Sequence, residues 1–356
     1  MEGFIFKIDP IWKKKDVVGI DIGTKTIKFV QLKKHGRLTR LVSYGQIPVP
    51  ENFIIEGIVA EPEKLSEIIR KFFNENKWGK ITAKRVCASL PESKIFTHIV
   101  SLPQKTTKEL VDAVNWEASQ TIPMAMTDLY MDWQVIGATE KNNEMVEVIY
   151  SAAPRAIVDS YMQLFSILGL EIESLETSLI PIVRAIISSK KNNVATLIID
   201  IGGRSTNLAV IDGFVRITGS TLLGGEQLTY RVSEALNINE TKATKDIVIK
   251  NTKDRAKIRQ ALDTEVTEIT KEATRVINYY ETNSEKHRKI ERVLICGGSA
   301  GLPTLIDIFT EKLGIKTEIG NPWLNISVYP IKSIPHQDVP GYTTAVGLAL
   351  LGVEND

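Results

Sequence analysis

Two patterns of apolar and polar residues alternate along the chain, one typical of strands and the other typical of helices. Short apolar runs bounded by turn residues predict strands at 17–22, 27–33, 40–47, 85–89, 95–102, 129–137, 145–151, 195–201, 206–211, 214–222 and 292–296. Apolar residues three and four positions apart predict helices at 62–75, 106–120, 155–168, 177–189, 225–237, 254–283, 303–313 and 343–351. This alternation predicts an α/β protein.

The segment 254–283 is the longest and most charged of the predicted helices. It has few large apolar residues in each turn. We therefore expect one face to pack against a small subdomain and the rest to lie in water.

One pattern occurs twice. Residues 17–32 are VVGIDIGTKTIKFVQL and residues 195–211 are ATLIIDIGGRSTNLAVI. When Asp21 and Asp200 are aligned, both copies contain Asp-Ile-Gly, then a basic residue, a hydroxyl residue and a second apolar run. A repeated strand, tight turn and strand predicts two related halves that face one another.

Both turns have the composition of a phosphate-binding site. A glycine directly after a buried strand allows a tight turn, and the backbone N–H groups that follow can point into one concavity. The hydroxyl and basic residues of the two turns could add donors and positive charge: Thr24, Thr26, Ser205 and Thr206, and Lys25, Lys28 and Arg204. A single Asp-x-Gly is also common in ordinary hairpins, but two copies in matching contexts favour the phosphate interpretation.

Asp21 and Asp200 each end a predicted strand, where a bare charge is costly to bury. Facing each other across a cleft, they could hold Mg²⁺ through water. Other phosphate-binding motifs are excluded. The chain has no GxxxxGK[ST], and the turn at Gly23 leads into a strand, whereas a dinucleotide-binding GxGxxG would lead into a helix.

A third motif, CGGSAGLP at 296–303, lies between a predicted strand and a predicted helix. Its glycines would let a flat ring approach the backbone, and a helix N-terminus favours an anion. The alternative is an ordinary tight turn between strand and helix.

The composition argues against nucleic-acid binding, a cysteine or histidine metal site and a membrane span. The 356 residues are enough for two domains, and 44 Lys plus Arg against 43 Asp plus Glu gives a net charge of +1, with no general electrostatic reason to bind nucleic acid. Cys87 and Cys296 form no CxxC and are expected in the core, and the four histidines have no metal-ligand spacing. No apolar run reaches the roughly 18 residues of a membrane span, and we expect a cytoplasmic protein.

The first 15 residues, MEGFIFKIDPIWKKK, combine apolar residues with three consecutive lysines. This pattern suits an anionic membrane surface. Docking of a frayed terminus on the domain is the alternative, and it is favoured because Pro10 interrupts any helix and the segment is short.

The order of the two hairpins, the GG turn and a terminal apolar helix resembles the actin-like ATPase superfamily. Within it the chain resembles the PilM family of type IV pilus assembly proteins, relatives of the division protein FtsA. The match extends from about residue 16 to 353, and WEASQTIP is its most specific segment. The segments that carry it are 18–32 (VGIDIGTKTIKFVQL), 56–59 (EGIV), 116–123 (WEASQTIP), 132–137 (DWQVIG), 169–178 (GLEIESLETS), 224–229 (GGEQLT) and 320–322 (GNP).

The sequence departs from the family pattern at two places. The first phosphate turn contains Thr24, Lys25 and Thr26, where the family is typically rich in serine. Residues 243–250 match only loosely the segment that contacts base and ribose, so no residue is carried over from them.

The resemblance implies an actin-like fold with two lobes, each with an RNase-H-like sheet. Lobe 1 would comprise 16–190, with an inserted subdomain at about 94–168, and would be completed by 341–353. Lobe 2 would comprise 191–340, with an insert at about 229–289 that takes in the long charged helix.

The resemblance also implies an ATP-binding protein with Mg²⁺ and weak or no ATPase activity. It would act in the cytoplasm, at the inner face of the cytoplasmic membrane. There it would bind the N-terminal cytoplasmic segment of a PilN-like inner-membrane partner, and self-association stays open. The implied cofactor-binding residues are Asp21, Gly23, Thr24, Lys25, Thr26, Lys28, Asp200, Gly202, Gly203, Arg204, Ser205, Thr206, Asn207, Gly297, Gly298, Ser299 and Leu302.

Two alternative functions have less support in the sequence. FtsA ordinarily carries an amphipathic membrane helix after a linker, whereas this sequence ends just after its last predicted helix, which favours the pilus family. A small-molecule kinase of the same superfold would need a carboxylate base beside an acceptor pocket, and no acceptor motif is evident.

The predicted insert is rich in aromatic residues and methionines, which suit an adaptable binding groove. Most of them are expected to fill the subdomain's own core instead. The residues are Trp116, Ile122, Met124, Met126, Tyr130, Met131 and Trp133.

Glu176 is the candidate for orienting the water that attacks the γ-phosphate, because filament-forming relatives have a glutamate at the matching place. The alternative is that its carboxylate caps the following helix near Ser178. The two roles are compatible.

Overall fold

The structure is a computed structural model that describes residues 16–36, 38–104, 106–138, 145–187, 194–239, 254–284, 288–324, 326–328 and 339–354. The N-terminal lysines and the 243–250 segment lie outside these residues. The chain divides into two compact units. Unit 1 consists of the described residues of Met1–Pro181, Ile326–Lys332 and Ala345–Asp356, and unit 2 of those of Ile182–Asn325 and Ser333–Thr344.

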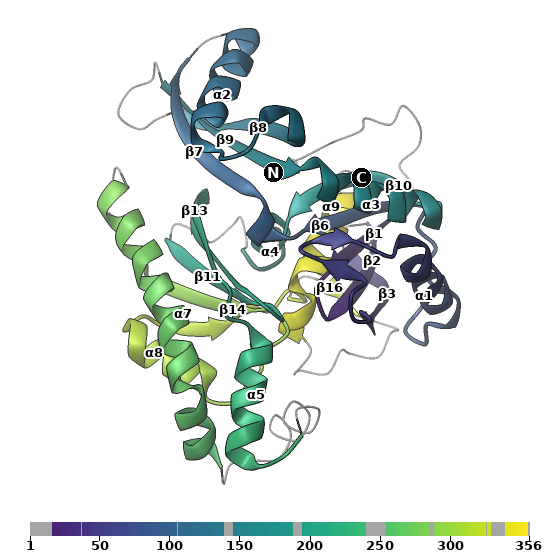
Figure 1. The fold of residues 1–356 in the computed structure, drawn as a ribbon, viewed down its shortest axis with the longest axis vertical. Helices are drawn as coiled ribbons and strands as arrows, with labels where there is room; N and C mark the ends of the chain where they lie inside the picture. The colour runs from purple at the N-terminus through teal and green to yellow at the C-terminus, as the bar shows by residue number, and fades with distance from the viewer. Residues whose placement is uncertain are drawn as a thin grey trace. The chain divides into compact units, whose positions relative to one another are not determined.

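Unit 1 is built on a six-stranded sheet with the order β10-β6-β1-β2-β3-β16 (Figure 1). Strand β1 pairs antiparallel with β2 and parallel with β6, which pairs parallel with β10. The strands are β1 (Val17–Ile22), β2 (Thr26–His35), β3 (Leu38–Pro48), β6 (Arg85–Leu90), β10 (Glu171–Thr177) and β16 (Ile326–Ser327). A short hairpin of β4 (Ile54–Ile55) and β5 (Ile58–Val59) precedes the first helix.

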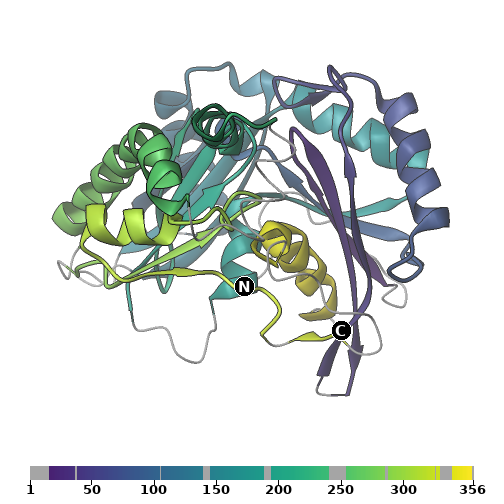
Figure 2. The same ribbon diagram turned by 90° about the horizontal axis from the view of Figure 1, so that it is seen from below.

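Both faces of this sheet are covered, because successive side chains of a strand point to opposite faces. Val18 and Ile20 of β1 join one core with helices α1 (Pro62–Glu75) and α3 (Arg155–Leu168). Val17 packs instead with Leu348 and Leu351 of α9 (Thr343–Glu354). Figure 2 shows α9, in yellow, on the side of the sheet away from α1 and α3.

The inserted part of unit 1 is a three-stranded antiparallel sheet, β7-β9-β8, covered by helix α2 (Figure 1). Its elements are β7 (Phe96–Pro103), α2 (Thr107–Thr121), β8 (Leu129–Ala138) and β9 (Met145–Pro154). They share one core, which contains Val114 of α2 and Val148 and Tyr150 of β9.

Helix α3 differs from the expectation. The segment 155–168 was expected in the insert, but Ile157, Tyr161 and Phe165 lie in the core of the six-stranded sheet. Helix α3 contacts α1 and β5, so the insert's own core ends with β9. The apolar period of a helix shows that one face is buried, but not which core receives it.

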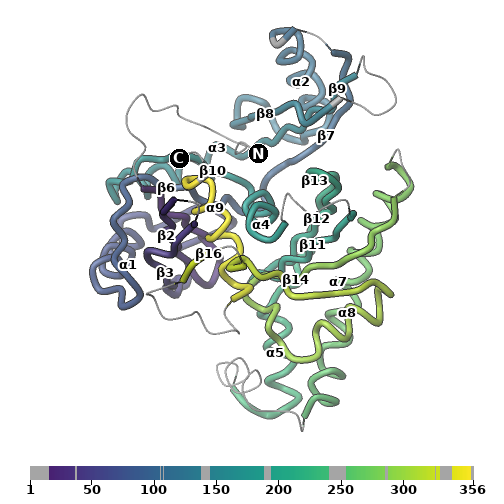
Figure 3. Tube along the Cα trace, turned by 180° about the vertical axis from the view of Figure 1, so that it is seen from behind, coloured from purple at the N-terminus to yellow at the C-terminus, as the bar shows by residue number. Residues whose placement is uncertain are grey.

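Unit 2 is built on a five-stranded sheet with the order β13-β12-β11-β14-β15, and Figure 3 traces its helices α5, α7 and α8. The strands are β11 (Thr196–Ile201), β12 (Thr206–Asp212), β13 (Phe214–Thr221), β14 (Arg292–Cys296) and β15 (Thr317–Ile319). Helices α5 (Gly225–Leu236), α7 (Arg255–Asn283) and α8 (Leu305–Leu313) share one core with the sheet.

The long helix α7 therefore packs on the main sheet of unit 2, where a separate small subdomain was expected. Its buried side chains, among them Ile258, Leu262, Ile269 and Val276, form a continuous stripe despite the charged composition. Charged side chains occupy the other faces, which lowered the apparent apolar content of each turn.

The duplicated hairpin is confirmed. Strands β11 and β12 repeat the antiparallel pairing of β1 and β2, and β14 lies parallel to β11 as β6 lies parallel to β1. Strands β13 and β3 extend the two sheets at the equivalent edge. The sequence repeat thus corresponds to a repeat of sheet topology.

Strand β10 was missed. Its buried positions include polar residues: Glu173 forms a 2.9 Å ion pair with Arg85, and both side chains are buried. A strand whose interior side chains are charged has no apolar alternation and resembles a loop in sequence. Helix α4 (Leu179–Ile186) starts two residues later than predicted, because Thr177 still belongs to β10.

Candidate functional site

The first predicted phosphate turn joins β1 to β2. Its N–H group at Gly23 donates to the carbonyl oxygen of Thr26 at 3.1 Å, which closes the turn tightly. Thr24 and Lys25 are exposed at the tip, and Thr26 is half-buried at the start of β2. In this turn the side chains expected to meet a phosphate are open to solvent.

Asp21 stands at the base of this turn, with its side chain 17% exposed. It accepts a 2.8 Å hydrogen bond from Ser89 Oγ, and Lys28 Nζ lies 3.9 Å from its other oxygen. The negative charge of Asp21 adds to burial in raising the pKa of Tyr161 on α3. Ser89 was not singled out in the sequence, because a serine at a strand end carries no motif of its own.

Glu176 is fully buried near the carboxyl end of β10. It pairs in parallel register with Ser89 of β6, which in turn bonds Asp21 of β1. Because β10, β6 and β1 are neighbours and parallel, the three polar residues lie side by side near the carboxyl ends of these strands. The candidate for water positioning therefore lies in the same cluster as Asp21.

Glu92 makes two capping contacts at the start of the next helix. Oε2 of Glu92 accepts from the backbone N–H of Leu179, the first residue of α4, at 3.3 Å, and from Ser178 Oγ at 3.4 Å. Glu92 lies in the short 3₁₀ helix Glu92–Lys94. A glutamate far away in sequence thus takes part in the capping that was considered for Glu176.

The second predicted turn joins β11 to β12, with the Gly202 N–H donating to the Ser205 carbonyl oxygen at 3.0 Å. Arg204 is exposed, and its Nε lies 3.4 Å from Oε1 of Glu226. Thr206 is fully buried and donates its hydroxyl to the carbonyl of Leu223 at 2.7 Å. The hydroxyl of Thr206 is therefore not a donor for phosphate, contrary to the expectation.

Asp200 lies opposite Asn207 in the β11–β12 register, and both are more than nine-tenths buried. The Cys296 thiol donates to Oδ1 of Asp200 at 3.7 Å. Burial, followed by the charge and hydrogen bond of Asp200, raises the pKa of Cys296 well above its usual value, so the thiol stays protonated. The side-chain oxygen of Asn207 is buried without a hydrogen-bond partner.

The start of α5 packs directly on the second turn. The backbone N–H groups of Gly225 and Glu226 donate to the carbonyl oxygens of Gly202 and Gly203 at 2.8 and 2.9 Å. A Cβ atom on Gly225 would overlap Ser299 Oγ. The GGEQLT segment, noted in the sequence only for its resemblance, is thus part of the site.

The GG turn completes this arrangement from β14. Gly297 has φ +93°, and a Cβ atom there would overlap the carbonyl oxygen of Ile201 and lie 2.7 Å from Oδ1 of Asp200. Gly298 faces open space, with no atom within 4 Å of a Cβ built on it. Leu302 was expected to bind the cofactor, but its side chain is buried in the core of unit 2.

The donor chemistry suits a hard cation held through water. Asp200 and Asn207 offer carboxylate and amide oxygens, which Mg²⁺ prefers, and the Asn207 oxygen has an unused acceptor site. Around them, Gly225 and Gly297 allow a close approach of the backbone that any side chain would block. Within the described residues, no group of three or more His, Cys, Asp or Glu is placed to hold a metal ion directly.

Most of the aromatic residues and methionines of the insert are structural. Ile122 is buried in its core, Met126, Met131 and Trp133 pack against that core, and Tyr130 packs against the core of the six-stranded sheet. Trp116 of α2 is 62% exposed, and Met124 is 38% exposed.

Comparison with known proteins gives the family. A family model described as type IV pilus assembly protein PilM matches residues 19–353. The chain belongs to the PilM family. The resemblance predicted from WEASQTIP and the accompanying segments is confirmed, and with it the assignment to type IV pilus assembly.

Solved structures confirm the actin-like fold. A PilM–PilN type IV pilus biogenesis complex is similar with a TM-score of 0.81 and 23% identity, over 96% of this chain and 99% of that one. MreB5 of Spiroplasma citri bound to AMPPNP has a TM-score of 0.54 and 14% identity, over 95% and 96% of the two chains. The ethanolamine utilization protein EutJ from Carboxydothermus hydrogenoformans has a TM-score of 0.55 and 16% identity, over 97% and 92%.

The division protein FtsA of Streptococcus pneumoniae is a more distant relative, 20% identical over 85% of this chain and 75% of its own length. The match to the PilM model therefore favours the pilus family over the FtsA-like alternative. No helix in the described ranges combines the length and apolar character needed to cross a membrane.

Proposed function

We propose that this PilM-family chain binds ATP with Mg²⁺, and that its two Asp-x-Gly turns take part in the binding. The observation that carries the proposal is the convergence in unit 2 of the β11–β12 turn, the start of α5 and the GG turn around Asp200. The similarity to an AMPPNP-bound MreB5 supports the same ligand class.

The proposed roles follow from the chemistry of each group. Asp21 and Asp200 would hold Mg²⁺ through water, and Asn207 would accept from a metal-bound water through its unpartnered oxygen. Mg²⁺ would neutralise phosphate charge. The residues between Gly23 and Thr26, and between Gly202 and Ser205, would bind phosphate oxygens, and Gly298 would lie under the base.

Substitution of Asn207 tests this assignment, because its side-chain oxygen forms no hydrogen bond in the protein without ligand. Asn207→Leu removes an unsatisfied buried acceptor while keeping similar volume, so the free energy of unfolding should be unchanged or higher. The affinity for Mg-ATP, measured by calorimetry, should fall several-fold. Unchanged affinity in a folded variant would contradict the role of Asn207.

We also propose that the insert binds the N-terminal cytoplasmic segment of a PilN-like inner-membrane protein. The similar PilM–PilN complex supports a partner of this kind. In the insert, Trp116 offers a large, rigid and exposed apolar surface, and Met124 offers an adaptable one. Such a partner would keep the chain at the inner face of the cytoplasmic membrane.

Binding of a fluorescent peptide of that segment would test the partner assignment. Trp116→Ala with Met124→Ala should weaken binding about tenfold or more, since exposed aromatic anchors dominate such interfaces. Tyr279→Ala on α7 is the matched control, because Tyr279 is also an exposed aromatic but lies in unit 2. Equal loss in both variants, or none in the first, would contradict the assignment.

A further inference from the structure

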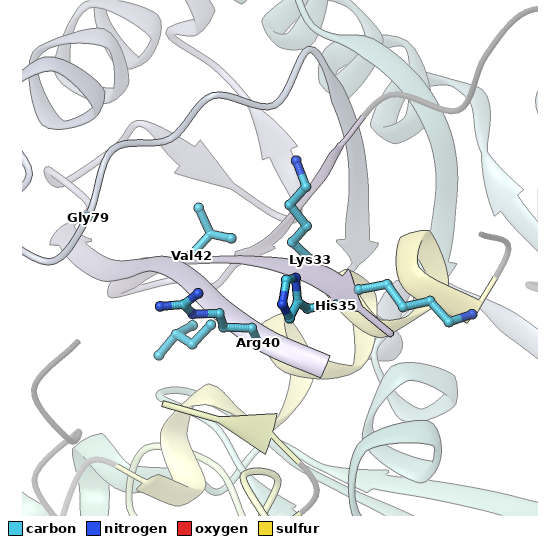
Figure 4. Close-up of a pocket in the computed structure, with 7 residues that line it drawn as sticks. Lys33, His35, Arg40, Val42 and Gly79 are labelled. Atoms are coloured by element: carbon cyan, nitrogen blue, oxygen red, sulfur yellow. The ribbon is translucent and has the colours of Figure 1, made fainter. Parts of the chain in front are cut away.

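A basic cavity lies at the end of the β2–β3 hairpin in unit 1. It has a volume of about 400 Å³, and four of its lining residues are Lys33, Lys34, His35 and Arg40. Figure 4 shows Lys33, His35 and Arg40 on these two adjacent strands, with Gly79 on the loop that borders them. None of the described residues that line the cavity is acidic.

A β-bulge shapes the floor of the cavity. The β2–β3 register passes from Gln31 opposite Ser43 to Leu32 opposite Leu41, which leaves Val42 as the extra residue. As a result, the consecutive residues Leu41 and Val42 both line the cavity. Bulges of this kind redirect side chains and are frequent at functional sites.

The loop wall is fixed by hydrogen bonds. Asn76 Nδ2 donates to the carbonyl oxygen of Gly79 at 2.9 Å and to that of Tyr44 at 3.0 Å, and Ser43 Oγ donates to the Gly79 carbonyl at 3.0 Å. Gly79 has φ +94°, and a Cβ atom there would overlap the Val42 carbonyl oxygen. The cavity is therefore a built feature of unit 1.

The basic side chains of the cavity are largely accessible to solvent. Asp16 lies 3.6 Å from Lys33 Nζ, and the Lys33 side chain is still 62% exposed. Lys34 and His35 are exposed, and Arg40 is half-buried. An anion with several oxygen acceptors, such as a phosphate group, matches this arrangement.

We propose that this cavity binds the phosphate of an anionic phospholipid headgroup. Two exposed apolar side chains adjoin it: Leu38 follows the hairpin tip, and Trp78, 40% exposed, precedes Gly79 and stacks on Tyr44. Trp is typical of the membrane interface, and basic residues beside apolar ones are typical of surfaces that bind anionic bilayers.

The exposed side chains of Leu38 and Trp78 favour a lipid over a free phosphate, because inorganic phosphate has no apolar part for them to contact.

This lipid site is independent of the proposed nucleotide site. Thr26, at the phosphate turn, and His35, at the cavity, are the two ends of β2. Ten strand residues extend about 30 Å. Direct contact with lipid also differs from membrane association through a partner protein. Pure lipid vesicles contain no partner, so they test direct contact alone.

Co-sedimentation of the full chain with vesicles tests the proposal. The parent should bind vesicles of phosphatidylglycerol and phosphatidylcholine, and not vesicles of phosphatidylcholine alone. Lys33→Ala/Lys34→Ala/Arg40→Ala should weaken binding roughly 100-fold, since each basic residue near an anionic surface contributes about a factor of five. The control Lys64→Ala/Lys71→Ala removes two exposed lysines of α1 and should change binding less than about twofold.

Calorimetry with inorganic phosphate separates the two sources of the anion. Saturation of the parent by phosphate, together with no binding to anionic vesicles, would overturn the lipid assignment. Equal vesicle binding by the parent and the triple variant would overturn the cavity as the site, as would an equal loss in the control. Mg-ATP affinity of the triple variant should match that of the parent, which shows that unit 1 is folded.

Discussion

The hydroxyl of Ser89 donates a 2.8 Å hydrogen bond to Oδ1 of Asp21, across the parallel pair β6 and β1. On the other side of β6, Ser89 lies in register with Glu176 of β10. Ser89 therefore lies between the carboxylate proposed to hold metal-bound water and the carboxylate proposed to orient the attacking water. This placement depends on the order of the strands in the sheet, since the three residues are far apart in sequence.

Ser89→Ala should weaken Mg-ATP binding less than Asp21→Ala does, because it removes a group that orients the carboxylate and leaves the carboxylate itself. The free energy of unfolding should fall by about 1 to 2 kcal/mol, as expected for a buried hydrogen bond to a charged group. Calorimetry and urea denaturation measure the two effects. Ser101→Ala, at an exposed serine of β7, is the control. A Ser89→Ala variant that behaves like this control would refute the orienting role.

Substitutions of Glu176 and Glu92 should have different effects, the first on ATP hydrolysis and the second on the stability of helix α4. Glu176→Gln should leave ATP affinity nearly unchanged and abolish whatever ATP hydrolysis the parent shows, since water positioning acts in the transition state. Glu92→Gln should instead lower the free energy of unfolding by about 1 kcal/mol, because it weakens the cap of α4, and should keep hydrolysis. The measurements are steady-state phosphate release and urea denaturation.

Hydrolysis by Glu176→Gln at the parent rate would limit Glu176 to a structural role. A parent without measurable hydrolysis would recast the chain as an ATP-dependent scaffold.

The sequence predicted the elements that bury continuous apolar runs or stripes. Helices α1 and α3 have the predicted bounds, and the repeated hairpins were predicted from their Asp-Ile-Gly turns. Strand β10 was missed because Glu173 and Glu176 are buried in it, and local pattern does not show that Arg85 neutralises Glu173. Burial of a charge depends on a partner that only the fold brings close.

The candidate site could be predicted only in part for the same reason, because some of its contacts join residues that only the fold brings close. Asp21 and Asp200 could be predicted because each lies next to a recognisable turn, whereas the contacts of Ser89 and Glu92 depend on how neighbouring strands and helices pack. Thr206 and Leu302 were assigned by position in a motif. Their side chains point into the structure, to the Leu223 carbonyl and to the core of unit 2.

The packing of Gly225 against Ser299 can be tested by a compensating pair. Gly225→Ala should lower the free energy of unfolding by about 1 to 3 kcal/mol, because its methyl group would overlap the Ser299 hydroxyl. Adding Ser299→Gly should recover part of the loss, since it removes the overlapping atoms. Urea denaturation of both single variants and the double variant measures the coupling. Strict additivity would contradict the contact.

His98 should make stability depend on pH. Burial lowers its pKa below the usual 6.5, and its ring stacks on Tyr150 in the insert. As pH falls below about 6.5, the unfolded chain takes up a proton that the folded chain does not. The stabilising contribution of neutral His98 is therefore complete above that pH and is lost as the pH falls through the lowered value.

Urea denaturation between pH 7.5 and pH 5 should show this loss in the parent and a shallower decrease in His98→Gln. His35→Gln, which removes an exposed histidine, is the control. Identical pH dependence in the parent and His98→Gln would show that His98 does not titrate differently on folding.

Calorimetric titration of ATP with Mg²⁺ into the parent, Asp21→Ala and Asp200→Ala tests the central claim most directly. The account predicts saturable binding by the parent and, in each folded variant, an affinity lower by on the order of 1 to 3 kcal/mol, because a group that holds metal-bound water is lost. Parent affinity in both variants, or a parent that binds no Mg-ATP, would contradict nucleotide binding by the two Asp-x-Gly turns.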